Sequence, residues 1–218
     1  MIVDTDADPA VTAERLVDTK FLNAGQTCVA PDYVLAVGDA AARLEPALAA
    51  AVRAKFGDEP SDSPLYGRIV NHRHFDRLNN LLASGRVVVG GPDRPDAKYI
   101  APTVLADVSP DAPVMSEEIF GPILPIIAVP DVDAPSGSSP RGTSRWRSTP
   151  SPSPSRRRHG SWPKPPPARV GFGLPVLHLT VPSLPFGGVG ESGMGRYHGK
   201  YSIDTFSHLK AVLDKPLA

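Results

Sequence analysis

Cysteine is nearly absent from this 218-residue sequence, in which Cys28 is the single example. One cysteine excludes an intrachain disulfide framework and suits a reducing compartment, so we expect a cytoplasmic protein. The sequence also lacks net charge, which removes any global attraction to nucleic acid. No apolar run approaches the roughly 18 residues of a spanning helix, and the acidic first ten residues do not resemble a signal peptide. We therefore expect a soluble chain with no membrane anchor and no nucleic-acid partner.

Acidic and aliphatic side chains are missing from residues 135–169, which instead hold nine Pro, nine Ser, seven Arg and one Lys. This tract carries a charge of +8, so the remainder of the neutral chain carries −8. Prolines remove backbone donors, and the tract contains no Val, Ile, Leu or Met for the buried face of a strand. The composition predicts disordered polyproline-II or coil structure over 134–169 and rules out a buried strand there. It also divides the chain into 1–133, 134–169 and 170–218.

Two interpretations of this tract stay open, one about its origin and one about its function. Its codons, read one base out of phase with GC-rich wobble bases, turn "PSGSSPRGTSRWRST" into A-I-R-F-V-P-A-R-D-K-P-L-A-L-Y. That product has the character of a helix followed by a buried strand, which favours a frame-shifted stretch. Alternatively, "SPSPSRRRH" and "PKPPPAR" resemble a proline-rich ligand or a basic nucleic-acid-binding arm.

Outside the tract, helical and strand patterns alternate. Apolar spacing and flanking Pro and Gly residues predict helices at 9–24, 46–56 and 71–84, and short apolar runs predict strands at 32–37, 86–91, 99–108 and 122–129. The glycines at 187–195 predict a loop, and 202–213 a final amphipathic segment or strand. The fold class is therefore α/β, with a largely parallel sheet covered by helices.

Cys28 stands in "NAGQTCVAPDY", between a flexible approach and a proline. A lone cysteine is commonly an inert, buried apolar residue, but a thiolate is also a strong nucleophile. Three stretches bear on this choice: "KFLNAGQTCVAPDY", "SEEIFGPILPI" and "LPFGGVGESGMGRYHGK". Together they resemble the signatures of the aldehyde dehydrogenase superfamily. "YGRIVNHRHFDRL" and "GMGRYHGKYSIDTFSH" are similar to its class 3, fatty-aldehyde-oxidising branch.

The resemblance covers residues 1–133 and 170–218, and it implies part of that family's catalytic domain with most of the cofactor domain absent. It implies NAD(P)-dependent oxidation of an aldehyde to a carboxylic acid. Cys28 would be the nucleophile that forms a thiohemiacetal and then a thioester. Glu118 would accept hydrogen bonds from the nicotinamide-ribose hydroxyls of NAD or NADP, and Phe120 would pack beside the nicotinamide. Members of the family are often homodimers.

Other polar residues near these motifs have open interpretations. Asn23 and Thr27 resemble positions that shape the pocket around the thiol, although structural roles fit equally well. For Glu117 we favour a solvated surface role. His72 and His74 are spaced like metal ligands, but the sequence offers no third ligand, so we expect helix-surface residues and no metal.

The resemblance also implies residues that this sequence does not contain. The family's general base is a glutamate in a Glu-Leu-Gly-Gly-Lys-type motif, and no such motif occurs in the 218 residues. Loss of a general base typically removes a factor on the order of 10²–10⁴ in rate. We therefore expect this fragment to be inactive alone and poorly stable. The alternatives are a Pro/Arg-rich interaction or nucleic-acid-binding protein, and a remnant without function.

Overall fold

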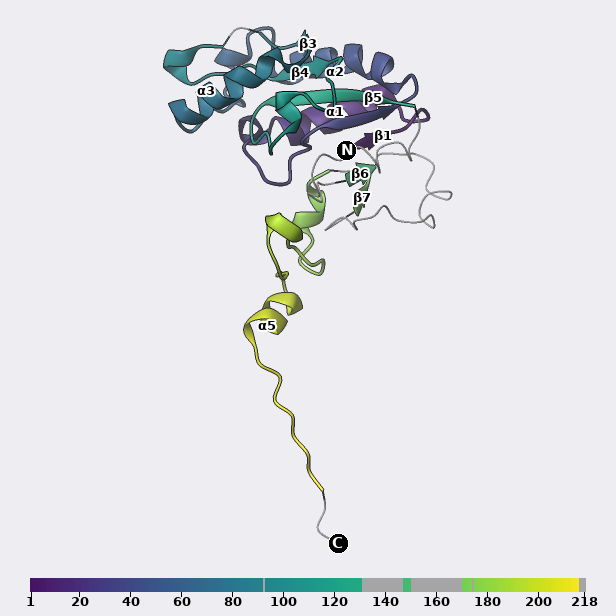
Figure 1. Cartoon of the computed structure of the whole chain (residues 1–218), viewed down its shortest axis with the longest axis vertical. Coiled ribbons are helices and arrows are strands. Elements are labelled where there is room, and N and C mark those ends of the chain that lie inside the picture. Colours follow the sequence, from purple (N-terminus) through teal and green to yellow (C-terminus); the bar gives the residue numbers. More distant parts are fainter. Residues whose placement is uncertain (92, 131–146, 150–169, 174, 216–218) are drawn as a thin grey trace. The chain divides into compact units, whose positions relative to one another are not determined.

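A computed structural model describes residues 1–91, 93–130, 147–149, 170–173 and 175–215. The chain divides into two units, Met1–Val176 and Leu177–Ala218. Most of the predicted proline-rich tract lies outside the described residues. Figure 1 shows the first unit as the part that carries the labelled sheet and its helices.

The first unit is built on a five-stranded sheet with the strand order β1-β2-β5-β4-β3. The β1–β2, β2–β5 and β4–β5 pairs are parallel, and only the β3–β4 pair is antiparallel. The strands are β1 (Ile2–Val3), β2 (Val34–Val37), β3 (Arg86–Val89), β4 (Thr103–Ala106) and β5 (Ile123–Val129). This arrangement confirms the predicted α/β class and the largely parallel sheet, and β1 is an addition that the sequence did not predict.

Burial explains why the central strands read as continuous apolar runs. Every residue of β2 and β4 is buried, and all of β5 except Ala128 is buried as well. A strand buried on both faces has no polar alternation, as is usual in parallel sheets covered on both sides. The edge strand β3 is more exposed, and Arg86 on it pairs with Glu45 and Asp107.

Helix α1 (Pro9–Lys20) begins where the sequence predicted it. The Asp8 carboxylate accepts a hydrogen bond of 2.9 Å from the Val11 amide, and Pro9 occupies the first turn, where no backbone donor is needed. The buried face of α1 consists of Thr12, Ala13, Leu16, Val17 and Lys20. The predicted helix ran on to residue 24, whereas α1 ends at Lys20 and a 3-10 turn follows at Leu22–Gly25.

Helix α2 spans Ala40–Phe56, so the prediction that it begins at Pro46 was wrong. Proline lacks the N–H that would reach the carbonyl of Ala42, which normally disfavours it inside a helix. Both Pro46 and Ala42 are exposed, so water can satisfy the freed carbonyl. The opposite face of α2 is buried in the core through Leu44, Leu48 and Val52. This packing stabilises the helix on both sides of Pro46.

Helix α3 (His72–Leu81) agrees with its prediction. Asn71 caps it by accepting a hydrogen bond of 2.9 Å from the His74 amide, and Phe75, Leu78 and Leu81 form its buried face. His72 is exposed on the first turn and His74 is half-buried. Among the residues that the structure describes, no group of three or more His, Cys, Asp or Glu side chains is placed to hold a metal ion.

A second, two-stranded sheet joins part of the proline-rich tract to the sequence after it. Strand β6 (Arg147–Thr149) pairs in parallel with β7 (Val170–Phe172). The sequence predicted no strand within 134–169, and this prediction was wrong for the three residues of β6. The prediction of disorder for the remaining residues of the tract falls outside the described residues.

The second unit is short and has little packing. It contains 3-10 turns at Leu177–Thr180 and Gly190–Ser192 and the helix α5 (Lys200–Phe206), and its described residues beyond α5, 207–215, form no helix or strand. An isolated antiparallel bridge joins Phe186 to Tyr197 around the predicted glycine loop. No helix in the described part of the chain is both long enough and apolar enough to cross a membrane.

Candidate active site

Cys28 lies in the connection between α1 and β2. This connection begins with an unusual backbone, because Asn23, Ala24 and Gly25 have φ angles of 52°, 53° and 73°. Three consecutive left-handed residues turn the chain sharply after α1. Cys28 follows within a hydrogen-bonded turn, in which the Ala30 amide donates to the Thr27 carbonyl at 3.0 Å. The Cys28 side chain is exposed, so the thiol is not the buried apolar residue of the simpler interpretation.

Glu118 and Phe120 lie in the segment that leads into β5. Both side chains are exposed, whereas Ile119 between them is fully buried. Phe120 has a φ of 46°, and this left-handed conformation is strained for an aromatic residue. Ile119 thus fixes the segment in the core while its two neighbours face solvent.

The segments of Cys28 and Glu118 are packed directly against each other. A Cβ atom built on Gly25 would lie 2.1 Å from the Gly121 carbonyl oxygen, so only glycine permits this approach. Asp32 adds a polar link, since its Oδ1 accepts a hydrogen bond of 2.9 Å from the Ile119 amide. Two motifs about 90 residues apart in sequence therefore meet at one place in the fold.

Lys20 is a fully buried cation beside this junction, with 1% of its surface exposed. Burial lowers the pKa of the Lys20 ammonium from 10.5 to about 8, while the carboxylates of Asp32 and Glu118 act to raise it. These Coulombic interactions show that the cation lies near one carboxylate from each of the two segments. A desolvated, charged residue at such a point is typical of functional sites, although structural ion clusters share this feature.

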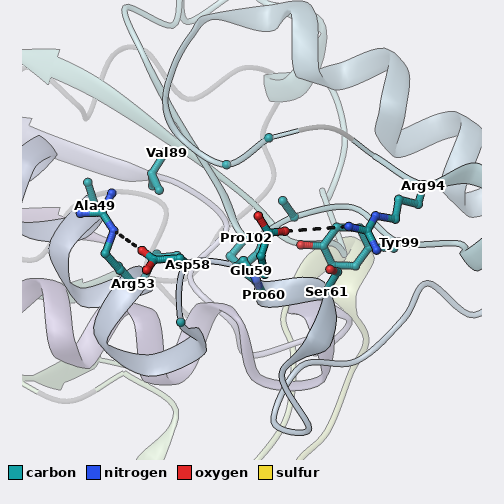
Figure 2. Close-up of a pocket in the computed structure, with 15 residues that line it drawn as sticks. Ala49, Arg53, Asp58, Glu59, Pro60, Ser61, Val89, Arg94, Tyr99 and Pro102 are labelled. Carbon is teal, nitrogen blue, oxygen red and sulfur yellow. Dashed lines mark ion pairs between the residues drawn. The ribbon is translucent and has the colours of Figure 1, made fainter.

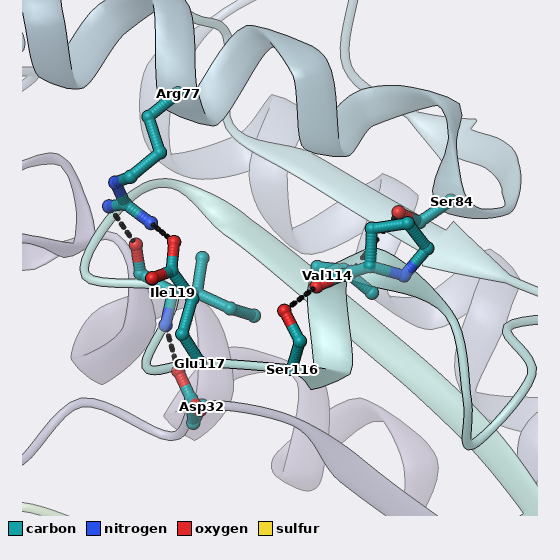
Figure 3. A network of polar contacts seen from close by, with 8 residues as sticks. Asp32, Arg77, Ser84, Val114, Ser116, Glu117 and Ile119 are labelled. Atoms are coloured by element: carbon teal, nitrogen blue, oxygen red, sulfur yellow. Dashed lines mark hydrogen bonds and ion pairs between the residues drawn. The ribbon is translucent and has the colours of Figure 1, made fainter.

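Glu117 has a structural partner. Its carboxylate accepts a hydrogen bond of 2.9 Å from Arg77 of α3, and the same guanidinium donates to the Ile119 carbonyl at 2.6 Å (Figure 3). Figure 3 also shows Asp32 reaching the Ile119 amide from the other side, so this one peptide segment is bound from both directions. Glu117 is exposed at the surface as we expected, but it forms an ion pair with Arg77 and is not simply solvated.

A cavity of about 260 Å³ lies elsewhere in the first unit, between the end of α2 and the end of β3 (Figure 2). Its charged residues are paired with one another: Arg53 with Asp58 at 3.0 Å and Arg94 with Glu59 at 3.9 Å. None of Cys28, Glu118 and Phe120 lines it. Because each of the two arginines is paired with a carboxylate, the cavity presents no unbalanced charge to a ligand. The four charged side chains are also mostly exposed to solvent.

The part of the chain that contains the Cys28 and Glu118 segments matches a known family. Residues 1–134, more than half of the chain, match the model described as "Aldehyde dehydrogenase family". The chain belongs to the aldehyde dehydrogenase family. The chain is 47% identical over 216 residues to aldehyde dehydrogenase family 3 member B1 of Rattus norvegicus, covering 97% of this chain and 45% of the relative.

A bacterial relative gives a similar result. The chain is 43% identical over 223 residues to the 4,4'-diaponeurosporen-aldehyde dehydrogenase of Staphylococcus aureus, covering 99% of this chain and 47% of that protein. A solved structure, described as a substrate-bound state of Staphylococcus aureus AldH, superimposes with a TM-score of 0.82 at 39% identity and covers 99% of this chain and 49% of that one. The chain thus spans about half the length of the relatives it matches. These matches confirm the class 3-like resemblance and the partial-domain fold.

The structure adds two residues at this junction that the sequence analysis did not single out: Lys20 and Asp32. Lys20 had a usable signal, because it continues the buried spacing of Ala13, Leu16 and Val17 on α1. Asp32 had none, since its partner Ile119 is 87 residues away in sequence.

Proposed function

We propose that this chain supplies the nucleophile and the nicotinamide-side contacts of an enzyme that oxidises aldehydes to carboxylic acids with NAD or NADP. The observation that carries the proposal is the exposed thiol of Cys28 in a turn packed against the Glu118–Gly121 segment. The general base and most of the cofactor domain would come from sequence outside these 218 residues. A single, exposed cysteine suits a reducing compartment, so we extend the proposal to a cytoplasmic location. Assembly of the whole enzyme as a homodimer stays a prediction.

In this proposal the Cys28 thiolate attacks the aldehyde carbonyl carbon, and the C–S bond forms as the C=O π electrons move to oxygen. The Cys28 backbone N–H stabilises the resulting oxyanion of the thiohemiacetal. NAD or NADP, when bound, supplies the acceptor for the hydride that leaves the former carbonyl carbon. Water then hydrolyses the thioester at Cys28, which releases the carboxylic acid and the thiol.

Glu118 and Phe120 fit the nicotinamide end of such a cofactor by their chemistry. An exposed carboxylate can accept hydrogen bonds from both hydroxyls of a ribose diol. Phe120 is 43% exposed and offers an aromatic face within the same segment. These two residues would hold the nicotinamide ribose and the ring beside it, and they do not distinguish NAD from NADP.

Alkylation of the single cysteine tests the proposal. The chain would be treated with iodoacetamide with and without a straight-chain aldehyde such as hexanal, and modification of Cys28 followed by mass spectrometry. We expect the aldehyde to slow alkylation because the thiohemiacetal occupies the sulfur. A Cys28→Ser variant should remain unmodified and serves as the background. Equal alkylation rates over a wide range of aldehyde concentrations would contradict the proposed chemistry.

A further inference from the structure

The Cys28 turn has no regular secondary structure to hold it. Residues 26–33 lie between a 3-10 turn and β2, and a backbone hydrogen bond within them joins Ala30 to Thr27. A nucleophile must be held close to its reacting geometry, and a misplacement of about 1 Å can cost on the order of 10²-fold in rate. The support of Cys28 must therefore come from side chains on either side of it.

Gln26 binds the turn on one side. Its side-chain Nε2 donates to the Asn23 carbonyl and to the Arg68 carbonyl, both at 3.0 Å. Its Oε1 accepts from the Val70 amide, also at 3.0 Å. One amide group thus uses both donors and its acceptor, and two of the three bonds reach a segment 42 to 44 residues away in sequence.

Asp32 binds the turn on the other side. Its Oδ1 accepts from the Ile119 amide at 2.9 Å, which connects the turn to the segment of Glu118 and Phe120. A carboxylate acceptor makes this hydrogen bond stronger than one between neutral groups. The half-buried Asp32 also lies near the buried cation of Lys20.

We propose that Gln26 and Asp32 are positioning residues that anchor the Cys28 turn from both sides, Gln26 to the 68–70 segment and Asp32 to the 117–121 segment. The proposal rests on the proposed function, in which Cys28 is the nucleophile. Neither residue reacts with the substrate. Each one acts by fixing the backbone that carries the thiol, and both act on residues 26–32.

The single cysteine allows a direct test on the full 218-residue chain. A nitroxide spin label attached to Cys28 reports the local mobility of the turn through its electron paramagnetic resonance spectrum. We expect the spectrum of the labelled chain without substitutions to contain an immobilised component. We expect this component to be lost in Gln26→Ala and in Asp32→Ala. Asp32→Asn retains an oxygen that accepts from the Ile119 amide, so we expect it to restore the immobilised component. Asn80→Ala, at an exposed position of α3, is the matched control and should leave the spectrum unchanged.

Hydrogen exchange of the Val70 amide gives a second readout that does not depend on the label. Gln26→Ala should accelerate its exchange on the order of 10- to 100-fold, because the acceptor of that N–H is removed. Gln26→Glu keeps an acceptor for Val70 but loses both donated bonds, and we expect an intermediate rate. If the anchors act on one turn, the effects of Gln26→Ala and Asp32→Ala on label mobility will not be additive.

Three results would overturn the proposal: an unprotected Val70 amide in the unmodified chain, a label at Cys28 that is already fully mobile there, or spectra unchanged by both Gln26→Ala and Asp32→Ala. The first two need no variant, so they hold even where a substitution unfolds the chain. The aldehyde protection experiment separates this inference from the proposed function. Anchoring without aldehyde protection would contradict the function alone, and protection with a mobile turn would contradict the anchors alone.

Discussion

The two units of this chain differ in how much of themselves they bury. The first unit encloses a continuous core of aliphatic and aromatic side chains from β1, β2, β4 and β5 and from α1, α2 and α3, and the partly buried Val88 and Val89 of β3 pack against it. In the second unit no residue that the structure describes is buried, and Met194, Phe206, Leu209 and Leu213 are each at least 85% exposed. The hydrophobic term is the main favourable contribution to folding, so the first unit holds the stability of the chain and the second contributes little.

The largest expected effect comes from creating a cavity in the core of the first unit. Leu124 of β5 is fully buried, and Leu124→Ala should lower the free energy of unfolding by about 2–5 kcal/mol. Leu209→Ala removes the same atoms from a side chain that is 94% exposed. It should change the free energy of unfolding by less than about 0.5 kcal/mol. Urea denaturation followed by circular dichroism measures both. Equal losses would show that the second unit is packed after all.

A glycine pair sharpens the comparison at the candidate site. Gly25→Ala places a methyl group against the Gly121 carbonyl at a φ of +73°, and we expect a loss of about 3 kcal/mol and separation of the two site segments. Gly190 in the second unit has a similar φ of +62° but open space around it. Gly190→Ala should therefore cost only the backbone strain, about 1 kcal/mol. Thermal unfolding of the two variants provides the measurement.

The buried Lys20 makes stability depend on pH. Its pKa in the folded chain is about 8, below the ordinary 10.5, so between these values the unfolded chain keeps a proton that the folded chain has released. The free energy of unfolding therefore rises with pH, by about 2 kcal/mol between pH 8 and 10. Above pH 10 the trend reverses, because burial raises the pKa of Tyr66 and the folded chain then retains the extra proton.

Substitutions of lysine isolate this effect. Lys20→Met should abolish the rise between pH 8 and 10, whereas Lys210→Met, at an exposed position of the second unit, should preserve it. Denaturant titrations at several pH values measure the slope for each variant. A rise that persists in Lys20→Met would assign the pH dependence to another group.

The smallest predicted differences concern ion pairs. Arg77 has a side chain that is 26% exposed and bonds both Glu117 and the Ile119 carbonyl, so Arg77→Ala should cost about 1–2 kcal/mol. Lys200 and Asp204 form an exposed pair within α5, and Lys200→Ala should cost less than about 0.5 kcal/mol. Unfolding in low and high salt distinguishes the two, since only the exposed pair is fully screened.

Local patterns predicted most elements of the first unit. The apolar spacing of Phe75, Leu78 and Leu81 predicted α3, and the apolar runs predicted β2, β3, β4 and β5. The start of α2 was predicted wrongly at Pro46, because the rule for proline at helix starts is local and the packing of Leu44 and Leu48 is not. Strand β6 was missed for a similar reason, since pairing with β7 depends on residues more than 20 positions away.

The sequence by itself determined the family, the α/β class and the identity of the single thiol, because motifs and apolar periodicity are properties of the order of residues. Only the tertiary structure decided that Cys28 is exposed, that Gly25 meets Gly121, and that Gln26 and Asp32 bind the turn from two sides. These contacts join residues 42 to 96 positions apart, and long-range packing and hydrogen bonding leave no signal in the spacing of neighbouring residues.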